Sequence, residues 1–136
     1  MQDPFVGTWK LNVEKSEFDA HHRPKAATLV FALDAEGYYV KTAEGINEKG
    51  EKIAERPERF TPDGKAHPLP NLPGLKYLVT RTDPNAMTGE VTREDGSVVG
   101  GSTTAVSADG QSMTVDNSGY DSQLRQFKVR TAWDRQ

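Results

Sequence analysis

Cysteine is absent from this sequence of 136 residues, and its absence excludes several kinds of chemistry. The chain cannot form a disulfide, hold a metal through thiolates or use a cysteine nucleophile. No apolar run of about 18 residues occurs either, so the sequence predicts no membrane-spanning helix. Lys and Arg number 17 against 20 Asp and Glu, and they do not gather into a basic run, which argues against a nucleic-acid partner.

Helical periodicity is also scarce. No segment keeps a 3.6-residue apolar period over three turns, and the best candidate is one short turn at residues 13–18. Turn signals that combine Asp, Asn or Glu with Gly or Pro recur instead, at 34–37, 48–50, 62–64, 83–85, 94–96 and 108–110. Between them, segments alternate apolar and polar residues, as at 28–33, 75–82, 97–106, 112–117 and 126–133.

This pattern predicts an all-β fold for the single domain 1–136. We expect eight to ten antiparallel strands in an up-and-down meander, rolled into a barrel because long open edges are unfavourable. An immunoglobulin-like sandwich is the alternative.

Hairpin geometry predicts which side chains point inward. If 34–37 and 94–97 are four-residue loops, Leu33 lies opposite Tyr38 and Arg93 lies opposite Val98. The same reasoning places Ser107 opposite Ser112. The predicted inward set is Leu29, Phe31, Leu33, Tyr38, Val40, Leu75, Tyr77, Val79, Arg81, Met87, Val91, Arg93, Val98, Ser102, Val106, Met113, Val115 and Asn117. A slip of one residue would invert the facing of a strand.

Small residues in the predicted interior favour a cavity over a filled barrel. Gly89, Gly100 and Ser102 occupy little volume, and barrels of this size either fill with side chains or hold one small ligand. An apolar pocket with a few polar groups is the general form of a small-molecule site. The alternative to a polar group inside the cavity is that Arg81 and Arg93 lie near strand ends and extend their charged groups into solvent.

The first strand resembles that of a known family. Gly7-Thr8-Trp9, with a basic residue such as Lys128 or Arg130 on the last strand, is similar to the Gly-x-Trp signature of lipocalins and related calycins. The segments 3–12, 15–18 and 106–115 resemble small bacterial lipocalin-like proteins. The resemblance implies a lipocalin-like barrel with one open end, and it assigns Trp9 and Arg130 to the closed base.

Other candidate chemistry is weaker. His21, His22 and His67 lie in two loops that could meet at the mouth and offer imidazole ligands, but adjacent histidines on an extended chain point apart, so we predict no metal site and no cofactor. The acidic candidates for proton transfer are Glu55, Glu58 and Asp116. Glu55 and Glu58 lie in a stretch of alternating charge around Pro57, which is typical of a sheet edge that avoids further pairing. Residues 14–25 and 68–74 are expected to form mobile gates.

The sequence therefore predicts a protein that binds a small apolar or aromatic molecule in a barrel cavity. The predicted ligand-binding residues are Tyr38, Tyr77, Arg81, Arg93, Asn117, Trp133 and His67. A cofactor-independent enzyme, an isomerase, cyclase or lyase using the same pocket, is the alternative, and a filled interaction module is a third. The abrupt entry into the first strand favours a periplasmic or secreted protein whose signal peptide has been removed, with a cytoplasmic one as the alternative. We expect a monomer or weak dimer.

Overall fold

The computed structural model describes residues 3–18, 24–55, 57–69, 72–120 and 125–136. Every helix or strand in these ranges is a β-strand, as the alternating sequence predicts. The eleven strands are β1 (Gly7–Glu17), β2 (Ala26–Leu33), β3 (Tyr39–Ile46), β4 (Lys52–Ala54), β5 (Glu58–Phe60), β6 (Asp63–Pro68), β7 (Leu75–Asp83), β8 (Ala86–Arg93), β9 (Val98–Val106), β10 (Ser112–Tyr120) and β11 (Gln126–Arg135). The count slightly exceeds the predicted eight to ten because two short strands, β4 and β5, share the length of β3 as pairing partners.

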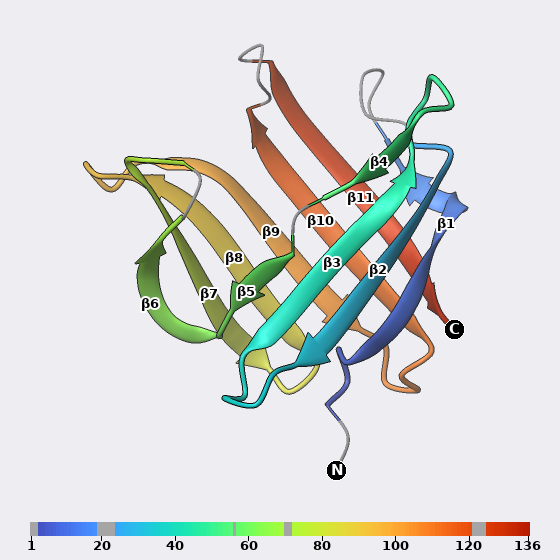
Figure 1. Cartoon of the computed structure of the whole chain (residues 1–136), viewed down its shortest axis with the longest axis horizontal. Helices are drawn as coiled ribbons and strands as arrows, with labels where there is room; N and C mark the ends of the chain where they lie inside the picture. The colour runs from blue at the N-terminus through green and yellow to red at the C-terminus, as the bar shows by residue number, and fades with distance from the viewer. Residues whose placement is uncertain (1–2, 19–23, 56, 70–71, 121–124) are drawn as a thin grey trace.

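The strands form one antiparallel up-and-down sheet that rolls into a barrel (Figure 1). The hydrogen-bonded order runs β4-β3-β2-β1-β11-β10-β9-β8-β7-β6, and β5 pairs with β3. The first and last strands are neighbours, so β1 and β11 lie at the middle of the sheet. The two edges of the sheet meet through side chains.

That meeting line, which we call the seam, consists of Tyr39 on β3, Phe60 on β5, and Tyr77 and Arg81 on β7. The Tyr39 and Phe60 rings stack with centroids 5.4 Å apart, and Phe60 meets Tyr77 edge to face at 6.3 Å. The Arg81 guanidinium donates to the Tyr39 hydroxyl at 3.3 Å. Aromatic contacts thus replace a strand ladder where the barrel closes.

Two hairpin predictions are wrong by one residue. The turn after β2 is a three-residue loop in which the Asp34 N–H donates to the Tyr38 carbonyl and Gly37 adopts φ 84°. Leu33 therefore lies opposite Tyr39, not Tyr38. A glycine with positive φ at the end of the turn is typical of three-residue hairpin loops. Tyr39 is consequently the inward tyrosine, and Tyr38 and Val40 point outward.

The β8–β9 hairpin shows the same shortening. The Arg93 N–H donates to the Ser97 carbonyl, so Val98 lies opposite Thr92 on the outer face. A register shift then restores the expected facing, because Val91 lies opposite Gly100. Val98 is 55% exposed, which contradicts its predicted inward position. The predictions for the β9–β10 hairpin are confirmed, with Val106 opposite Met113.

The expected helical turn at residues 13–18 is a bulged part of β1 instead. Asn12 pairs with Ala132, and Glu17 already pairs with Arg130, so β1 carries extra residues between these positions. The Ser16 hydroxyl bridges the bulge: it donates to the Asn12 carbonyl at 2.7 Å and accepts from the Ala132 N–H at 2.8 Å. The serine side chain thus supplies hydrogen bonds that a regular ladder would have made.

The closed end of the barrel is built around Trp9, which is fully buried. The Arg135 guanidinium lies 4.2 Å from the centroid of the Trp9 ring. It also donates to three carbonyl oxygens, those of Gly110 at 2.6 Å, Val6 at 2.8 Å and Pro4 at 2.7 Å. A Cβ on Gly7 would collide with this guanidinium, which explains the glycine two places before the tryptophan.

Arg130 does not hold that position, so its assignment to the base is wrong. Its side chain is half exposed and pairs with Asp116 at 2.7 Å on the outer face. Strand alternation explains the correction, since Arg135 is the residue directly opposite Trp9. The role that the resemblance implied is therefore present, but it belongs to a different arginine.

A second polar group seals the base beside the seam. The hydroxyl of Tyr39, which is 2% exposed, is hydrogen-bonded to the Asp3 carboxylate, and Arg81 lies 3.9 Å from the same carboxylate. Burial raises the pKa of Tyr39 to about 12, and the Asp3 carboxylate adds to the rise. Asp3 thereby ties the N-terminal segment to β3 and β7.

Arg135→Met should lower the free energy of unfolding by about 3 kcal/mol, because three carbonyl groups lose a charged donor. Chemical denaturation measures this loss. Arg130→Met on the same strand is the matched control, and its exposed ion pair predicts a much smaller effect. Equal losses in the two variants would contradict a special role for Arg135.

Tyr39→Phe should flatten the decline of stability at alkaline pH. The raised pKa means that the folded protein keeps a proton which the unfolded chain loses above pH 10. The free energy of unfolding therefore falls by about 1.4 kcal/mol per pH unit between pH 10 and about 12 from this group alone. Urea titrations across that window should give a steeper slope for the wild type; parallel slopes would refute the assignment.

Candidate functional site

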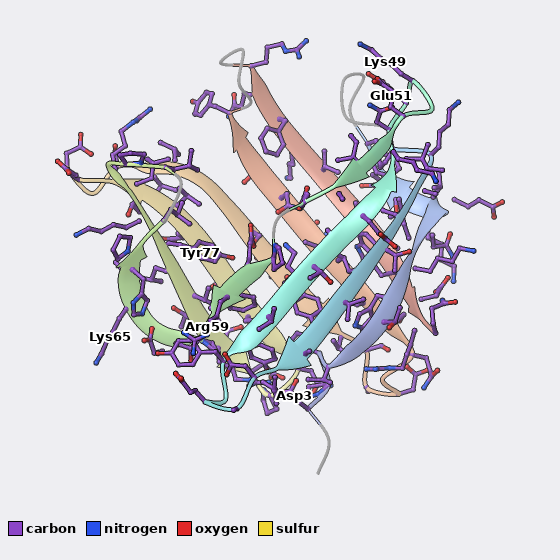
Figure 2. The ribbon with its side chains drawn as sticks, viewed as in Figure 1. Asp3, Lys49, Glu51, Arg59, Lys65 and Tyr77 are labelled. Carbon is purple, nitrogen blue, oxygen red and sulfur yellow. The ribbon has the colours of Figure 1, made fainter. Side chains whose placement is uncertain are left out.

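The barrel encloses a cavity of about 760 Å³ that opens at the end opposite Trp9. Side chains from the inner faces of β2, β3 and β7 to β11 line it. Asp3 marks the closed lower end in Figure 2, Lys49 lies at the upper end, and Tyr77 lies between them. The predicted hollow interior is therefore present.

Most of the cavity wall is apolar. Leu29, Phe31 and Ala43 form the wall on β2 and β3, and Val115 and Val129 face them from β10 and β11. Trp133 covers the floor, and its indole N–H is already bonded to the Thr131 hydroxyl at 2.8 Å. Trp133 thus presents an apolar ring to the cavity and no free donor.

A small polar group interrupts this wall at the level of β7 to β10. The Tyr77 hydroxyl on β7 and the Ser102 hydroxyl on β9 approach the same point of the cavity wall. Both sit over Gly89, where an added Cβ would lie 2.8 Å from the Tyr77 oxygen and 3.1 Å from the Ser102 oxygen. Gly89 therefore leaves the space in which these two hydroxyls meet.

Burial raises the pKa of Tyr77, the negative charge of Glu58 adds to the rise, and the Ser102 hydrogen bond opposes it. The Tyr77 hydroxyl consequently stays protonated at neutral pH. Chemically it is suited to donate a hydrogen bond rather than to accept a proton as a base.

Asn117 completes the polar group. It lies directly opposite Ser102 on β10 and lines the cavity. Among the described residues its side-chain amide has no hydrogen-bond partner, so both its carbonyl oxygen and its NH₂ group are available to a ligand. We call Tyr77, Ser102 and Asn117 the polar cluster.

Lys41 is the cation on the inner face of β3. Its ammonium lies 3.8 Å from the Glu58 carboxylate on the neighbouring strand β5, while the side chain lines the cavity. The remaining charged residues of the lining are Glu44, Glu48, Lys49 and Glu55. Acidic groups therefore outnumber basic ones among the described residues that line the cavity.

Three of the seven predicted binding residues line the cavity, namely Tyr77, Asn117 and Trp133. Tyr38 points outward, where the Arg59 guanidinium stacks 3.9 Å from its ring centroid. Its exclusion follows from the shorter β2–β3 turn.

Three further predicted residues also lie outside the lining. Arg81 serves the seam, and its second nitrogen donates to the Pro84 carbonyl at 3.1 Å. Arg93 is exposed and lies 3.4 Å from the Ser97 hydroxyl at the β8–β9 turn. His67 is half exposed on β6 and is bonded to Asp63 at 2.8 Å.

His21 and His22 lie outside the described residues, as do parts of both predicted gates. Within the described part of the chain, no three His, Cys, Asp or Glu side chains are placed to hold a metal ion together. No helix in that part is long and apolar enough to cross a membrane.

The sequence analysis missed Tyr39, Phe60 and Lys41. The one-residue error at the β2–β3 hairpin placed Tyr39 and Lys41 on the outer face. Gly37 could have corrected it, because a glycine with positive φ is typical of a three-residue hairpin loop. Phe60 lies on a three-residue strand in a charged stretch, where no alternation is long enough to read.

Gly89→Ala should destabilise the protein by about 1 to 2 kcal/mol, because the new methyl group must displace the Tyr77 and Ser102 hydroxyls. Gly101→Ala is the matched control on β9, since its Cβ would meet only the Gly89 carbonyl at 3.4 Å. Thermal and urea unfolding compare the two. A Gly89 variant as stable as the Gly101 variant would show that the hydroxyls are not held there.

Similarity to known proteins is confined to structure. No family model matches the chain, and no curated protein sequence matches it. Among solved structures, the fluorescent protein UnaG is similar at a TM-score of 0.65 with 14% identity, and the match covers 100% of both chains.

Two further barrels match over nearly their whole length. As-p18, an extracellular fatty acid binding protein, has a TM-score of 0.59 with 15% identity over 98% of this chain and 97% of its own. The zebrafish ileal bile acid-binding protein, complexed with cholic acid, has a TM-score of 0.59 with 13% identity over 98% and 99%. At these identities the likeness shows the fold alone, which is an antiparallel up-and-down β-barrel.

Proposed function

We propose that this protein binds a small apolar or aromatic molecule inside its barrel. The observation that carries the proposal is the cavity of about 760 Å³ with a largely apolar wall. Ligand sites commonly have volumes of about 300 to 1,000 Å³ and combine apolar walls with a few placed polar groups. The cavity and the polar cluster have both properties.

The structural neighbours support the same proposal. One is a fatty acid binding protein, and another is described in complex with cholic acid. Both share the fold of this chain over nearly their whole length. The shared fold makes an interior ligand a reasonable expectation here, and the cavity lining of this chain supplies the independent argument.

Binding is better supported than catalysis. His67, a predicted proton carrier, forms an exposed pair with Asp63, away from the cavity lining. The raised pKa of Tyr77 makes its hydroxyl a poor base at neutral pH. A binding role requires only the shape and the apolar surface of the cavity.

Ala43→Trp should abolish binding of an uncharged apolar fluorescent dye such as N-phenyl-1-naphthylamine, because the indole would project into the cavity. Thr42→Trp places the same side chain on the outer face of β3, since Thr42 alternates with the inward residues. Dye titration by fluorescence, with circular dichroism to verify folding, measures the difference.

The expected result is saturable binding by the wild type and by Thr42→Trp, and none by a folded Ala43→Trp variant. Equal binding by both variants would place the dye outside the barrel and contradict the proposal. Ala27→Trp, nearer the mouth on β2, is the second variant if Ala43→Trp fails to fold.

A further inference from the structure

Whether the cavity accepts a charged or an uncharged ligand can be argued from its polar groups. We infer that the polar cluster of Tyr77, Ser102 and Asn117 selects ligands whose polar group is uncharged, such as a hydroxyl, carbonyl or amide, over carboxylates. This inference rests on the proposed binding function and deepens it by naming the ligand class.

The cluster is neutral and offers both donors and acceptors. The Asn117 amide on β10 supplies two N–H donors and a carbonyl acceptor. None of these groups forms a hydrogen bond with another described residue. The hydroxyls of Tyr77 on β7 and Ser102 on β9 lie close to one another beside Gly89 on β8. A hydroxyl or carbonyl on a ligand can therefore exchange hydrogen bonds with the amide without bringing a charge into the barrel.

Among the described residues that line the cavity, an anion has no comparable partner. The Lys41 ammonium already faces the Glu58 carboxylate at 3.8 Å, so its positive charge is compensated within the protein. Glu58 also acts on Tyr77 as a negative charge, and it would repel a carboxylate bound at the cluster. A carboxylate entering this largely apolar space would lose hydration, and the described residues around the polar cluster offer it no uncompensated cation in return.

The charges at the mouth point the same way. Glu44, Glu48 and Glu55 outnumber Lys49 among the lining residues beyond Lys41. The chain as a whole carries a formal net charge of −3. Both features disfavour the approach of an anion and leave a neutral apolar molecule unaffected.

Gly89 shows how the cluster is accommodated. The absence of a side chain there leaves room for the Tyr77 and Ser102 hydroxyls on the cavity side of β8. Asn117, opposite Ser102, then borders that space from β10. Three strands thus bring their neutral polar groups to one part of a largely apolar wall.

Three probes that share one ring system test the inference: anthracenemethanol, anthracenecarboxylate and methylanthracene, each substituted on the central ring. Their binding is followed by quenching of tryptophan fluorescence at neutral pH. We expect the alcohol to bind about tenfold more tightly than the carboxylate, and more tightly than the methyl compound. A carboxylate that binds as tightly as the alcohol would overturn the inference.

Asn117→Leu separates a ligand contact from a structural role. The alcohol should lose about tenfold in affinity, while methylanthracene should bind as well as before or better, because one neutral hydrogen bond is removed and apolar surface is added. Ser118→Leu, the exposed neighbour on the outer face of β10, is the matched control and should change neither affinity. An equal loss for both probes would contradict a hydrogen bond from Asn117.

The outcomes distinguish the two proposals. If none of the three probes nor the dye binds, the proposed function itself fails. If the methyl compound and the carboxylate bind and the alcohol has no advantage, the barrel is a binding protein but the polar cluster does not select. A carboxylate that binds tightly and is lost on Lys41→Met would identify the ammonium as the anchor instead.

Discussion

The contact between Arg135 and Trp9 is the constraint on which the rest of the barrel depends. It joins the first strand, the last strand and the β9–β10 turn through one guanidinium with three carbonyl partners. Because β1 and β11 lie at the middle of the sheet, this contact fixes the join between its two halves. The closed base leaves the opposite end of the barrel as the open one.

The seam closes what the hydrogen-bonded ladder leaves open. Tyr39, Phe60 and Tyr77 form a row of rings from β3 across β5 to β7, and Arg81 bonds to the first of them. The same tyrosine that ends this row, Tyr77, presents its hydroxyl to the cavity. Closure of the barrel and placement of the polar cluster are therefore linked through one side chain.

The sequence was sufficient for the fold and for part of the cavity. Alternation and turn spacing predicted the antiparallel barrel, and they correctly placed Tyr77, Asn117 and Trp133 toward the interior. The errors came from turn length. Gly37 and Gly96 each shorten a loop by one residue, so Tyr38 and Val98 lie on the outer face of the sheet and not on the predicted inner face. Turn length depends on the backbone conformation of a few residues, which alternation along a strand does not encode.

Other details depend on contacts between distant segments. Choosing Arg135 over Arg130 requires the register of β1 on β11, and pairing Lys41 with Glu58 requires the short strand β5. The most direct test of a ligand inside the barrel is isotope-filtered nuclear Overhauser spectroscopy with bound anthracenemethanol. We predict contacts from the probe to Val115, Val129 and Trp133; contacts confined to outer residues such as Val98 and Tyr120 would contradict the account.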